Sequence, residues 1–293
     1  MQLLNPEVTV RAVVLGSGGQ LGRALSARLP GAVLLDLPDL DIADSAATSS
    51  FNWSGFDLVI NTAAYTAVDK AETPEGRVAA WRVNATGVAN LARAARDHDL
   101  TLVHISSEYV FDGRASGPVP EDAPFSPLSA YGASKAAGDV AAALCSSYYL
   151  VRTTWMIGDG ANFVRTMLGL AAQGATPTVV ADQVGRLTFA EDLASGIIDL
   201  TTSGQAAGTY NITNTGDPAS WADVARATFE LVGRSPGDVA DTTTAAYFAG
   251  RPEIARRPLN SVLDLRKAAA AGVHLPPWRD SLAAYVKKEC SSR

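Results

Sequence analysis

The sequence predicts an α/β protein in which a doubly wound parallel sheet is joined to a smaller C-terminal lobe. Short apolar runs rich in β-branched residues alternate with helical patterns through the first half of the chain, which is typical of strands buried on both faces. A glycine-rich turn links the first apolar run to the first helical pattern. After Trp155 the alternation ends, so we expect a second unit there.

The first strand is expected over 10–15, and a helical pattern over 23–29 follows it. Between them lies the turn GSGGQLG, in which Gly16, Gly19 and Gly22 have the spacing G-x-x-G-x-x-G. Glycine lets the turn form without Cβ clashes and lets backbone N–H groups approach a pyrophosphate at the helix N-terminus. Strand, turn and helix in this order predict a Rossmann dinucleotide site; the alternative is a glycine-rich turn without a ligand.

The second strand, 32–35, ends at Asp36, about twenty positions after the first glycine, where an acidic residue accepts hydrogen bonds from the adenosine ribose of NAD. No lysine or arginine that could bind a 2′-phosphate occurs between Arg28 and Lys70, and Arg23 reaches this end only if its helix presents that face. The sequence therefore predicts NADH or NADPH as cofactor, with NADH used at least as well. The alternative for Asp36 is a solvated loop carboxylate.

Two further strands are expected at 57–61 and 101–105. Small residues follow the first of them, which would let a cofactor lie close to the backbone, and Ser107 follows the second. Ligands of open α/β sheets bind at such carboxyl ends. Between these strands, 74–97 is predicted to be one long helix that contains Asn84 as an ordinary polar residue.

The helix predicted over 129–144, which precedes a fifth strand at 149–152, carries Tyr131 and Lys135 on one face. An ammonium ~5 Å from a phenolate stabilises it by roughly 3 kcal/mol at an effective dielectric near 20, or about two pKa units. We therefore expect Lys135 to lower the pKa of Tyr131, so that Tyr131 can protonate a carbonyl oxygen while hydride reaches the carbon. Ser107 could hold that oxygen. The spacing alone also fits a packed surface tyrosine.

The second half contains helical patterns at 162–172 and 190–200, a short strand at 179–180, and a strand at 209–212 that could return to the main sheet. We predict a dinucleotide-binding domain over 1–152 with a return segment near 187–213. A substrate-binding lobe is predicted over 153–186 and 214–293.

Composition narrows the function further. Of 293 residues, 47% are hydrophobic and 18% charged, as in ordinary globular proteins, and the net charge of −6 argues against a nucleic-acid partner. Cys145 and Cys290 indicate neither a disulfide framework nor a zinc site. Residues 1–8 lack the features of a secretory signal, and no apolar stretch is long enough to span a membrane. We expect a cytoplasmic protein without a membrane partner.

Taken together, these features resemble the extended short-chain dehydrogenase/reductases, and more narrowly the dTDP-4-dehydrorhamnose reductases, over nearly the whole chain. Beyond Tyr131 and Lys135, the resemblance rests on the motifs GQLG (19–22), NTAAYTAVDKAE (61–72), YVF (109–111), RTTW (152–155), NF (162–163), DQ (182–183) with Gly185, and RRPLNSVLDL (256–265). It implies hydride transfer from NAD(P)H to the C4 keto group of a dTDP-4-dehydro-6-deoxy sugar. The last step of dTDP-L-rhamnose formation is the reaction expected first.

The resemblance also assigns roles to residues. Tyr131 would be the proton donor, Lys135 would lower its pKa and hold the nicotinamide ribose, and Ser107 would hydrogen-bond the substrate carbonyl. With Tyr131 and Lys135, the implied cofactor-binding residues are Gly16, Gly19, Gln20, Leu21, Asp36, Asp41, Ala63, Ala64 and Tyr65. The implied substrate-binding residues are Trp155, Gln183, Arg257 and Asn260.

Three positions depart from the family pattern, all on the substrate side. Glu108 stands where the family has aspartate, Ile157 where it has tyrosine, and Leu187 where it has proline. Some relatives hold magnesium between subunits through glutamates; Glu191 matches one such position but Ala24 occupies another, so we expect no metal. A homodimer is an expected assembly.

Three alternatives to this reading remain. A nucleotide-sugar dehydratase would carry an Asp-Glu pair after the catalytic hydroxyl, whereas only Glu108 follows Ser107 here. A reductase acting on a different 4-keto sugar nucleotide would keep the same catalytic residues. A non-catalytic NAD(P)-binding regulatory subunit, such as that of methionine adenosyltransferase, also resembles this family.

Overall fold

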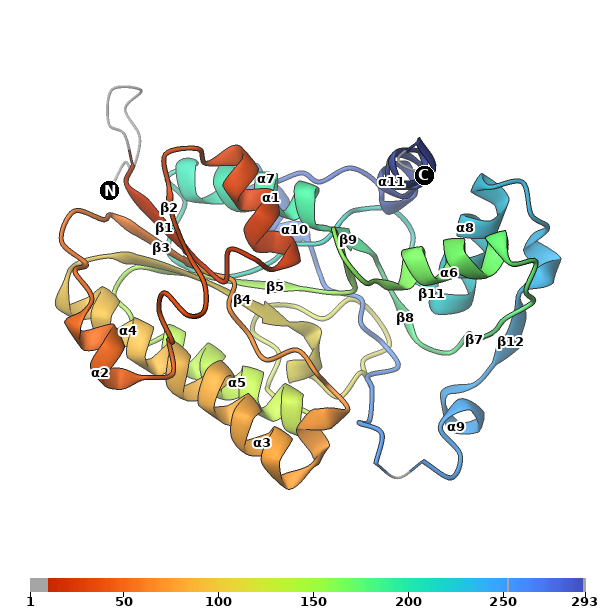
Figure 1. Cartoon of the computed structure of the whole chain (residues 1–293), viewed down its shortest axis with the longest axis horizontal. Coiled ribbons are helices and arrows are strands. Elements are labelled where there is room, and N and C mark those ends of the chain that lie inside the picture. Colours follow the sequence, from red (N-terminus) through yellow and green to blue (C-terminus); the bar gives the residue numbers. More distant parts are fainter. Residues whose placement is uncertain (1–9, 252, 292–293) are drawn as a thin grey trace.

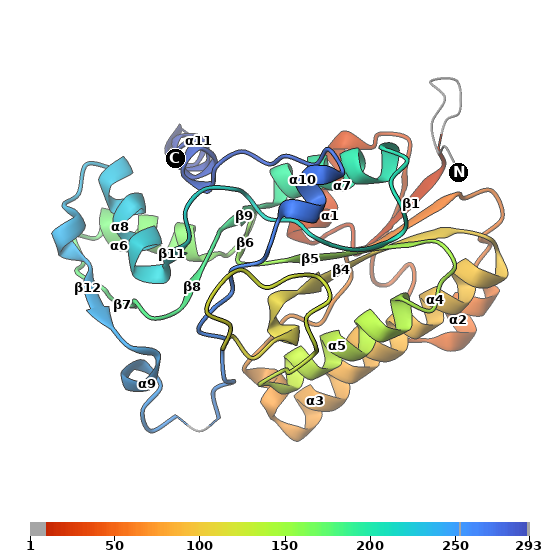
Figure 2. The same ribbon diagram turned by 180° about the vertical axis from the view of Figure 1, so that it is seen from behind.

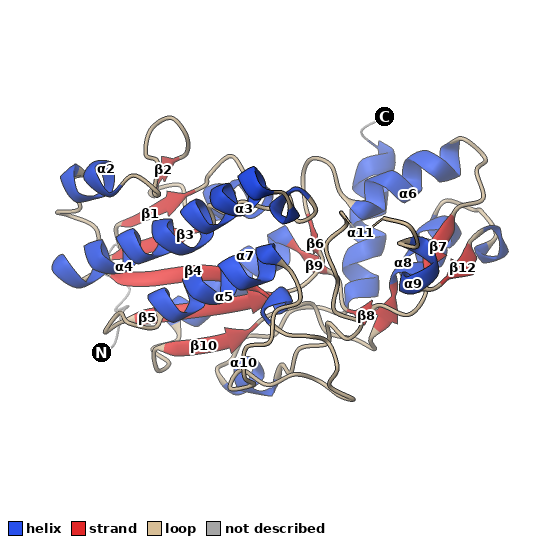
Figure 3. Cartoon of the chain, turned by 90° about the horizontal axis from the view of Figure 1, so that it is seen from below, coloured by secondary structure: helices blue, strands red, loops and turns tan. Residues whose placement is uncertain are grey.

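The computed structural model describes residues 10–251 and 253–291, so the segment 1–8 lies outside the described residues. Within them, six strands form one parallel sheet in the order β10-β5-β4-β3-β1-β2 (Figure 1 and Figure 3). The strands are β1 (Ala12–Leu15), β2 (Val33–Leu35), β3 (Leu58–Asn61), β4 (Thr101–Ser107), β5 (Tyr148–Thr153) and β10 (Gly208–Asn211). The chain moves outward from β1 to β2 and then resumes at β3 on the other side of β1. Ligands of open sheets bind at such a reversal, beyond the carboxyl ends of the strands.

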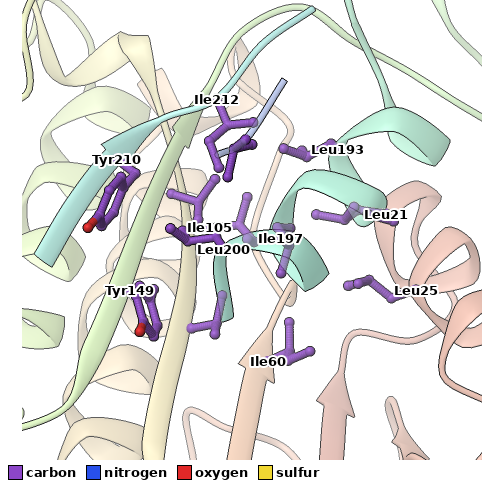
Figure 4. Close-up of a cluster of buried hydrophobic side chains, with 14 of the residues drawn as sticks. Leu21, Leu25, Ile60, Ile105, Tyr149, Leu193, Ile197, Leu200, Tyr210 and Ile212 are labelled. Atoms are coloured by element: carbon purple, nitrogen blue, oxygen red, sulfur yellow. The ribbon is translucent and has the colours of Figure 1, made fainter. Parts of the chain in front are cut away.

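Helices cover both faces of this sheet (Figure 1 and Figure 2). One face carries α1 (Gln20–Arg28), α7 (Ala190–Thr202) and α10 (Arg266–Ala270), and the other carries α2 (Ser45–Ser50), α3 (Pro74–Trp81), α4 (Val88–Asp97) and α5 (Ala130–Ala142). In Figure 4, leucines of α1 and α7 face Ile60 of β3 and Ile105 of β4, and all of these side chains belong to one buried cluster. The doubly wound α/β fold predicted from the sequence is thereby confirmed.

The smaller lobe lies beyond the carboxyl ends of the strands (Figure 3). Its helices are α6 (Phe163–Ala172), α8 (Trp221–Leu231), α9 (Thr244–Tyr247) and α11 (Trp278–Ser291). Short strand pairs join it together: β7 (Thr178–Val180) with β12 (Ala240–Thr242), β8 (Val184–Gly185) with β11 (Ala219–Ser220), and β6 (Met156–Ile157) with β9 (Thr188–Phe189). Its apolar side chains form two further buried clusters, one along α11 and one between α6 and α8.

Most predicted elements appear within a few residues of their expected bounds, and the predicted return strand is β10, which pairs in parallel with β5. Three differences affect the site or the domain limits. Helix α1 begins at Gln20, so the glycine turn is shorter than expected. The helix predicted over 74–97 contains a π-helical segment at Arg82–Gly87. Finally, α10 and the chain to Leu275 pack on the sheet, although the sequence assigns them to the lobe. No helix among the described residues is long and apolar enough to cross a membrane.

Candidate active site

A cavity of about 890 Å³ lies at the carboxyl ends of β1, β3 and β4 and extends to the lobe. Its volume is in the range of pockets that bind small molecules and cofactors. The sequence-predicted residues that line it are Gly16, Gly19, Gln20, Leu21, Asp36, Asp41, Ala63, Ala64, Tyr65, Ser107, Tyr131, Lys135 and Trp155. All of the cofactor-binding and catalytic candidates are therefore brought together at one cavity.

The glycine turn forms one end of this cavity and has no room for side chains. Gly16 has φ +75°, and a Cβ there would lie 2.6 Å from the backbone nitrogen of Ala63. A Cβ at Gly22 would lie 2.2 Å from the Gly16 carbonyl oxygen. Helix α1 starts directly after Gly19, which provides no side-chain cap. The turn thus presents bare backbone and the positive end of a helix to the cavity, which suits a pyrophosphate.

Asp36 closes the same end of the cavity against the glycine turn. Its Oδ2 accepts a hydrogen bond from the Gly18 backbone N–H at 2.7 Å, and its Oδ1 accepts one from the Leu37 N–H at 2.8 Å. Arg23 also lines the cavity, so helix α1 turns this residue toward it, which the sequence alone did not decide. Its guanidinium donates to the carbonyl oxygens of Gly18 and Asp159. A carboxylate and a cation therefore both line the cavity beside the glycine turn.

Ser107, Tyr131 and Lys135 all line the cavity. Ser107 is the last residue of β4, and the other two lie one turn apart on α5. Helix α5 is capped by Ser129, whose Oγ accepts a hydrogen bond from the Gly132 N–H at 3.1 Å. The Lys135 ammonium donates to the Ile105 carbonyl oxygen at 2.6 Å. This contact holds the lysine chain along β4, toward the strand end that carries Ser107.

The pKa shift of Tyr131 is opposite to the one expected from its spacing to Lys135. Burial is the main cause that raises the pKa of Tyr131 above its ordinary value, the Glu108 carboxyl raises it further, and a hydrogen bond with Ser107 offsets part of the rise. Burial also lowers the pKa of Lys135 from 10.5 to about 8, against the pull of the Asp139 carboxyl. Desolvation by burial is the largest cause of both shifts.

Asn84 was expected to be an ordinary helix residue, but it organises the cavity wall. It lies buried in the π-helical segment, where its Oδ1 accepts from the Tyr65 N–H at 2.8 Å and its Nδ2 donates to the Tyr65 carbonyl at 3.1 Å. The same Nδ2 donates to Ser134 Oγ at 3.0 Å, and Ser134 Oγ donates to the Tyr131 carbonyl at 2.7 Å. Asn84 thus ties the loop after β3 to helix α5. No local pattern in the sequence marks this role.

Glu108 is a second residue whose importance the sequence did not show. It is 3% exposed and follows Ser107, whose Oγ donates to its Oε2 at 2.7 Å. Burial raises the pKa of Glu108 to about 7, although the hydrogen bond with Ser107, the backbone of Glu108 itself and the Ser261 hydroxyl lower it. A carboxyl with such a pKa exchanges its proton near neutral pH.

An aromatic stack forms the lobe side of the cavity. The rings of Trp155 and Trp221 stack with centroids 3.8 Å apart and an angle of 17°, and Phe163 packs on Trp221. Trp155 has φ +42°, which a bulky residue adopts only when its surroundings require it. A Cβ at Gly185 would lie 2.9 Å from Trp155 Cε2, so this glycine makes room for the indole. Trp221, which the sequence analysis did not select, lines the cavity as well.

The other three substrate-side candidates do not line the cavity, and their roles stay predictions. Gln183 donates to Thr244 Oγ1 at 3.1 Å. Arg257 forms an ion pair with Asp69 at 2.9 Å and acts on the neighbouring Tyr109, which does line the cavity. Asn260 donates to two carbonyls of the loop 115–117, both at 2.8 Å. The family departures Ile157 and Leu187 are buried in the apolar cluster along α11.

Glu191 and Ala24, the two positions compared with the magnesium-binding glutamates of relatives, do not line the cavity. Glu191 Oε1 accepts from the Lys288 ammonium at 2.9 Å, and Ala24 lies near it on α1 beside a second pocket. Within residues 10–251 and 253–291, no group of three or more His, Cys, Asp or Glu side chains is arranged to hold a metal ion.

Comparison with known proteins places these features in a family. The family model described as RmlD substrate binding domain matches residues 10–290. The chain is 41% identical over 286 residues to a dTDP-4-dehydrorhamnose reductase of Mycolicibacterium smegmatis, covering 93% of this chain and 84% of that protein. It is 40% identical over 283 residues to a probable dTDP-4,6-dihydroxy-2-methyloxan-3-one 4-ketoreductase of Streptomyces antibioticus, covering 93% of each.

The fold has a close counterpart among solved structures. A crystal structure of dTDP-4-dehydrorhamnose reductase from Bacillus anthracis in complex with NADP superimposes with a TM-score of 0.87 at 31% identity. The match covers 96% of this chain and 100% of that one. The similarity therefore extends through both the sheet and the lobe.

Proposed function

We propose that the chain, which belongs to the RmlD substrate binding domain family, is a dTDP-4-dehydrorhamnose reductase like the relatives that it resembles. It transfers hydride from NADH or NADPH to the C4 keto group of a dTDP-4-dehydro-6-deoxy sugar, with dTDP-4-dehydrorhamnose as substrate and dTDP-L-rhamnose as product. The observation that carries the proposal is the meeting of Ser107, Tyr131 and Lys135 in the cavity that the glycine turn closes.

The residues present fit a dinucleotide. A Cβ at Gly16 or Gly22 would clash with protein backbone, so these glycines let the turn close tightly and direct the N-terminus of helix α1 toward the cavity, as a pyrophosphate requires. The Tyr65 hydroxyl and Thr153 Oγ1 are buried polar atoms of cavity-lining residues without a partner in the described chain, and a ligand could satisfy them. When bound, the cofactor supplies the hydride.

The side chains supply the proton and the orientation. The raised pKa of Tyr131 keeps its hydroxyl protonated at neutral pH, as a general acid requires. Ser107 hydrogen-bonds the carbonyl oxygen and fixes it beside that hydroxyl. The Lys135 ammonium, held on the Ile105 carbonyl, stabilises the phenolate that forms after proton transfer.

We further propose that NADH is used at least as well as NADPH. The Asp36 carboxylate lines the adenosine end of the cavity, where it would accept hydrogen bonds from a ribose 2′-OH and repel a 2′-phosphate. Arg23 is the cation that could offset this repulsion, but two backbone carbonyls already hold its guanidinium.

The test compares kcat/KM for the two cofactors at low salt. Asp36→Ala should shift the preference toward NADPH by about tenfold, the scale of one charged hydrogen bond exchanged for relief of repulsion. Glu75→Ala is the control, because this exposed carboxylate does not line the cavity. A wild-type preference for NADPH above about tenfold would show that Arg23 reads the phosphate and that Asp36 does not set the choice.

A different 4-keto sugar nucleotide is the second candidate substrate. The relative from Streptomyces antibioticus carries the name of a 4-ketoreductase for another dTDP sugar at nearly the same identity as the M. smegmatis reductase. Of the three family departures, Glu108 lines the cavity, whereas Ile157 and Leu187 are buried in the apolar cluster along α11. These observations concern which sugar is reduced, and the reduction of a 4-keto group is the same for both candidates.

The deciding experiment follows cofactor oxidation anaerobically against a panel of nucleotide 4-keto-6-deoxy sugars and identifies each product by NMR. The 3,5-epimerase is added where the L-sugar is required. Turnover of dTDP-4-dehydrorhamnose to dTDP-L-rhamnose with the highest kcat/KM supports the proposal. No turnover, together with recovery of a stoichiometric partner enzyme in a pulldown, would support a non-catalytic regulatory subunit. We expect this chemistry, and this chain, in the cytoplasm, with a homodimer as the expected assembly.

A further inference from the structure

Glu108 is a buried carboxyl that the proposed reaction leaves without a role. It lines the cavity, and its Oε2 accepts the hydrogen of Ser107 Oγ at 2.7 Å. Its Oε1 is buried and has no partner with hydrogen-bond geometry among the described residues. A buried carboxylate oxygen without a hydrogen bond destabilises the fold, because a buried charge needs hydrogen bonds to replace those with water.

The protonation of this carboxyl fixes the direction of the hydrogen bond to Ser107. A serine hydroxyl has one hydrogen to donate and two lone pairs. When Glu108 is ionised it can only accept, so the Ser107 hydrogen points to it and away from a substrate carbonyl. When Glu108 is protonated, its O–H can donate to Ser107 Oγ, and the serine hydrogen is then free to point toward the carbonyl oxygen.

We propose that Glu108 is a positioning residue whose own proton turns the Ser107 hydroxyl into a hydrogen-bond donor toward the substrate carbonyl. This inference rests on the proposed reductase function and adds a proton switch to it. No bond other than hydrogen bonds is made or broken in the switch. One proton bound at Glu108 reverses the donor and acceptor roles of two neighbouring groups.

The groups that face Glu108 leave this proton exchangeable near neutral pH. They are the hydroxyls of Ser107 and Ser261, which lower the pKa of Glu108, and the phenols of Tyr109 and Tyr131, whose own pKa values the Glu108 carboxylate raises. Arg257 acts on Tyr109, and no cation among the described residues offsets the desolvation of Glu108 itself. Burial raises the pKa of Glu108 to about 7, so near neutral pH this carboxyl is neither always ionised nor always protonated.

The test is the pH dependence of kcat/KM for carbonyl reduction in the wild type and in Glu108→Gln. Ionisation of Glu108 should lower kcat/KM about fivefold to tenfold, the scale of one lost hydrogen bond, so with a pKa of about 7 the wild-type value should fall about threefold to fourfold between pH 6 and pH 7.8. A second fall near pH 8 belongs to Lys135, whose pKa burial lowers to that value. Glutamine carries a donor amide at every pH, so Glu108→Gln should lose the first fall and keep the second.

Two comparisons separate this role from a structural one. Removing Ser107 removes the group through which Glu108 acts, so Ser107→Ala and Ser107→Ala/Glu108→Gln should share one pH profile. The exposed Glu75→Gln is the matched control and should keep both falls. A Glu108→Gln profile that still falls near pH 7 overturns the inference.

An infrared titration of the protein without substrate tests the switch independently of turnover. Difference spectra between pH 6 and pH 8 should show a protonated-carboxyl stretch that titrates near pH 7 and is missing in Glu108→Gln. Absence of such a band in the wild type overturns the inference. If the wild type reduces no 4-keto sugar at all, the proposed function fails, whereas this band still reports on Glu108.

Discussion

Replacing Lys135 by methionine should stabilise the fold at neutral pH while it removes reductase activity. Lys135 is 2% exposed, and burial lowers its pKa from 10.5 to about 8. A lysine whose folded pKa lies below its unfolded value costs stability at every pH below the folded pKa. The cost fades as the pH rises from about 8 to 10.5, because the unfolded chain binds more protons in that window.

The magnitude follows from the same values. The difference between 10.5 and about 8 is about 2.5 pKa units, which corresponds to about 3 kcal/mol of lost stability at pH 7. Methionine also loses the hydrogen bond from the ammonium to the Ile105 carbonyl at 2.6 Å, a charged bond of about 1.5–3 kcal/mol. The net gain in the free energy of unfolding should therefore be about 1 kcal/mol at pH 7 and should vanish or reverse at pH 10.5.

Urea unfolding at pH 7 and pH 10.5 measures both values. Lys287→Met is the matched control, because Lys287 is exposed on α11 and its removal should change the free energy of unfolding by less than about 0.5 kcal/mol at either pH. A Lys135→Met variant that is less stable than the wild type at pH 7, with an unchanged m-value, would refute the argument that burial of the ammonium costs more than its contacts return.

Three further substitutions test the geometry of the site, and a fourth is a control outside it. Tyr131→Phe should lower the chemical step by about 10² or more while the cofactor Kd changes little, as single-turnover and binding measurements can show. Ser107→Ala should lower the same step less, because one neutral hydrogen bond is lost. Gly185→Ala places a Cβ 2.9 Å from Trp155 Cε2, so it should raise the substrate KM and destabilise the fold by about 1–3 kcal/mol, with the cofactor KM unchanged. Gly169→Ala, which meets nothing within 4 Å in α6, should instead stabilise the fold by about 0.5–1 kcal/mol. A Gly185→Ala enzyme with wild-type substrate KM would remove the aromatic stack from the substrate site.

The cofactor end of the site could be predicted because its determinants are local in the sequence. Gly16, Gly19 and Gly22 are needed by the turn itself, and the helix that follows begins within that turn. Asp36 follows the neighbouring strand, and parallel strands bring their carboxyl ends to one edge of the sheet. Pattern and spacing are therefore enough to bring these residues to one cavity.

The residues that sequence reasoning missed depend on contacts between distant segments. Asn84 acts through a π-helical turn and through hydrogen bonds to Tyr65 and Ser134, which lie far from it in the sequence. Trp221 reaches the cavity only because α8 packs behind Trp155. Arg257 was selected from the sequence, but its ion pair with Asp69 is a contact that spacing cannot reveal. Such partners are set by tertiary packing, which no local pattern encodes.

Burial explains the wrong pKa expectation and sets the protonation of the resting site. The spacing of Tyr131 and Lys135 suggested an attraction of roughly 3 kcal/mol at an effective dielectric near 20. Desolvation of buried ions costs several kcal/mol each, so it dominates. In consequence, burial shifts the pKa values of Tyr131, Lys135 and Glu108 each toward the neutral form. Tyr131 and about half of the Glu108 carboxyls then carry protons at neutral pH. A protonated Tyr131 can donate to a carbonyl oxygen, and that donation leaves the same buried phenolate from which the reverse oxidation would begin. Burial therefore sets the protonation of the resting site, whereas the concentrations of the sugar and of the oxidised and reduced cofactor set the direction of the reaction.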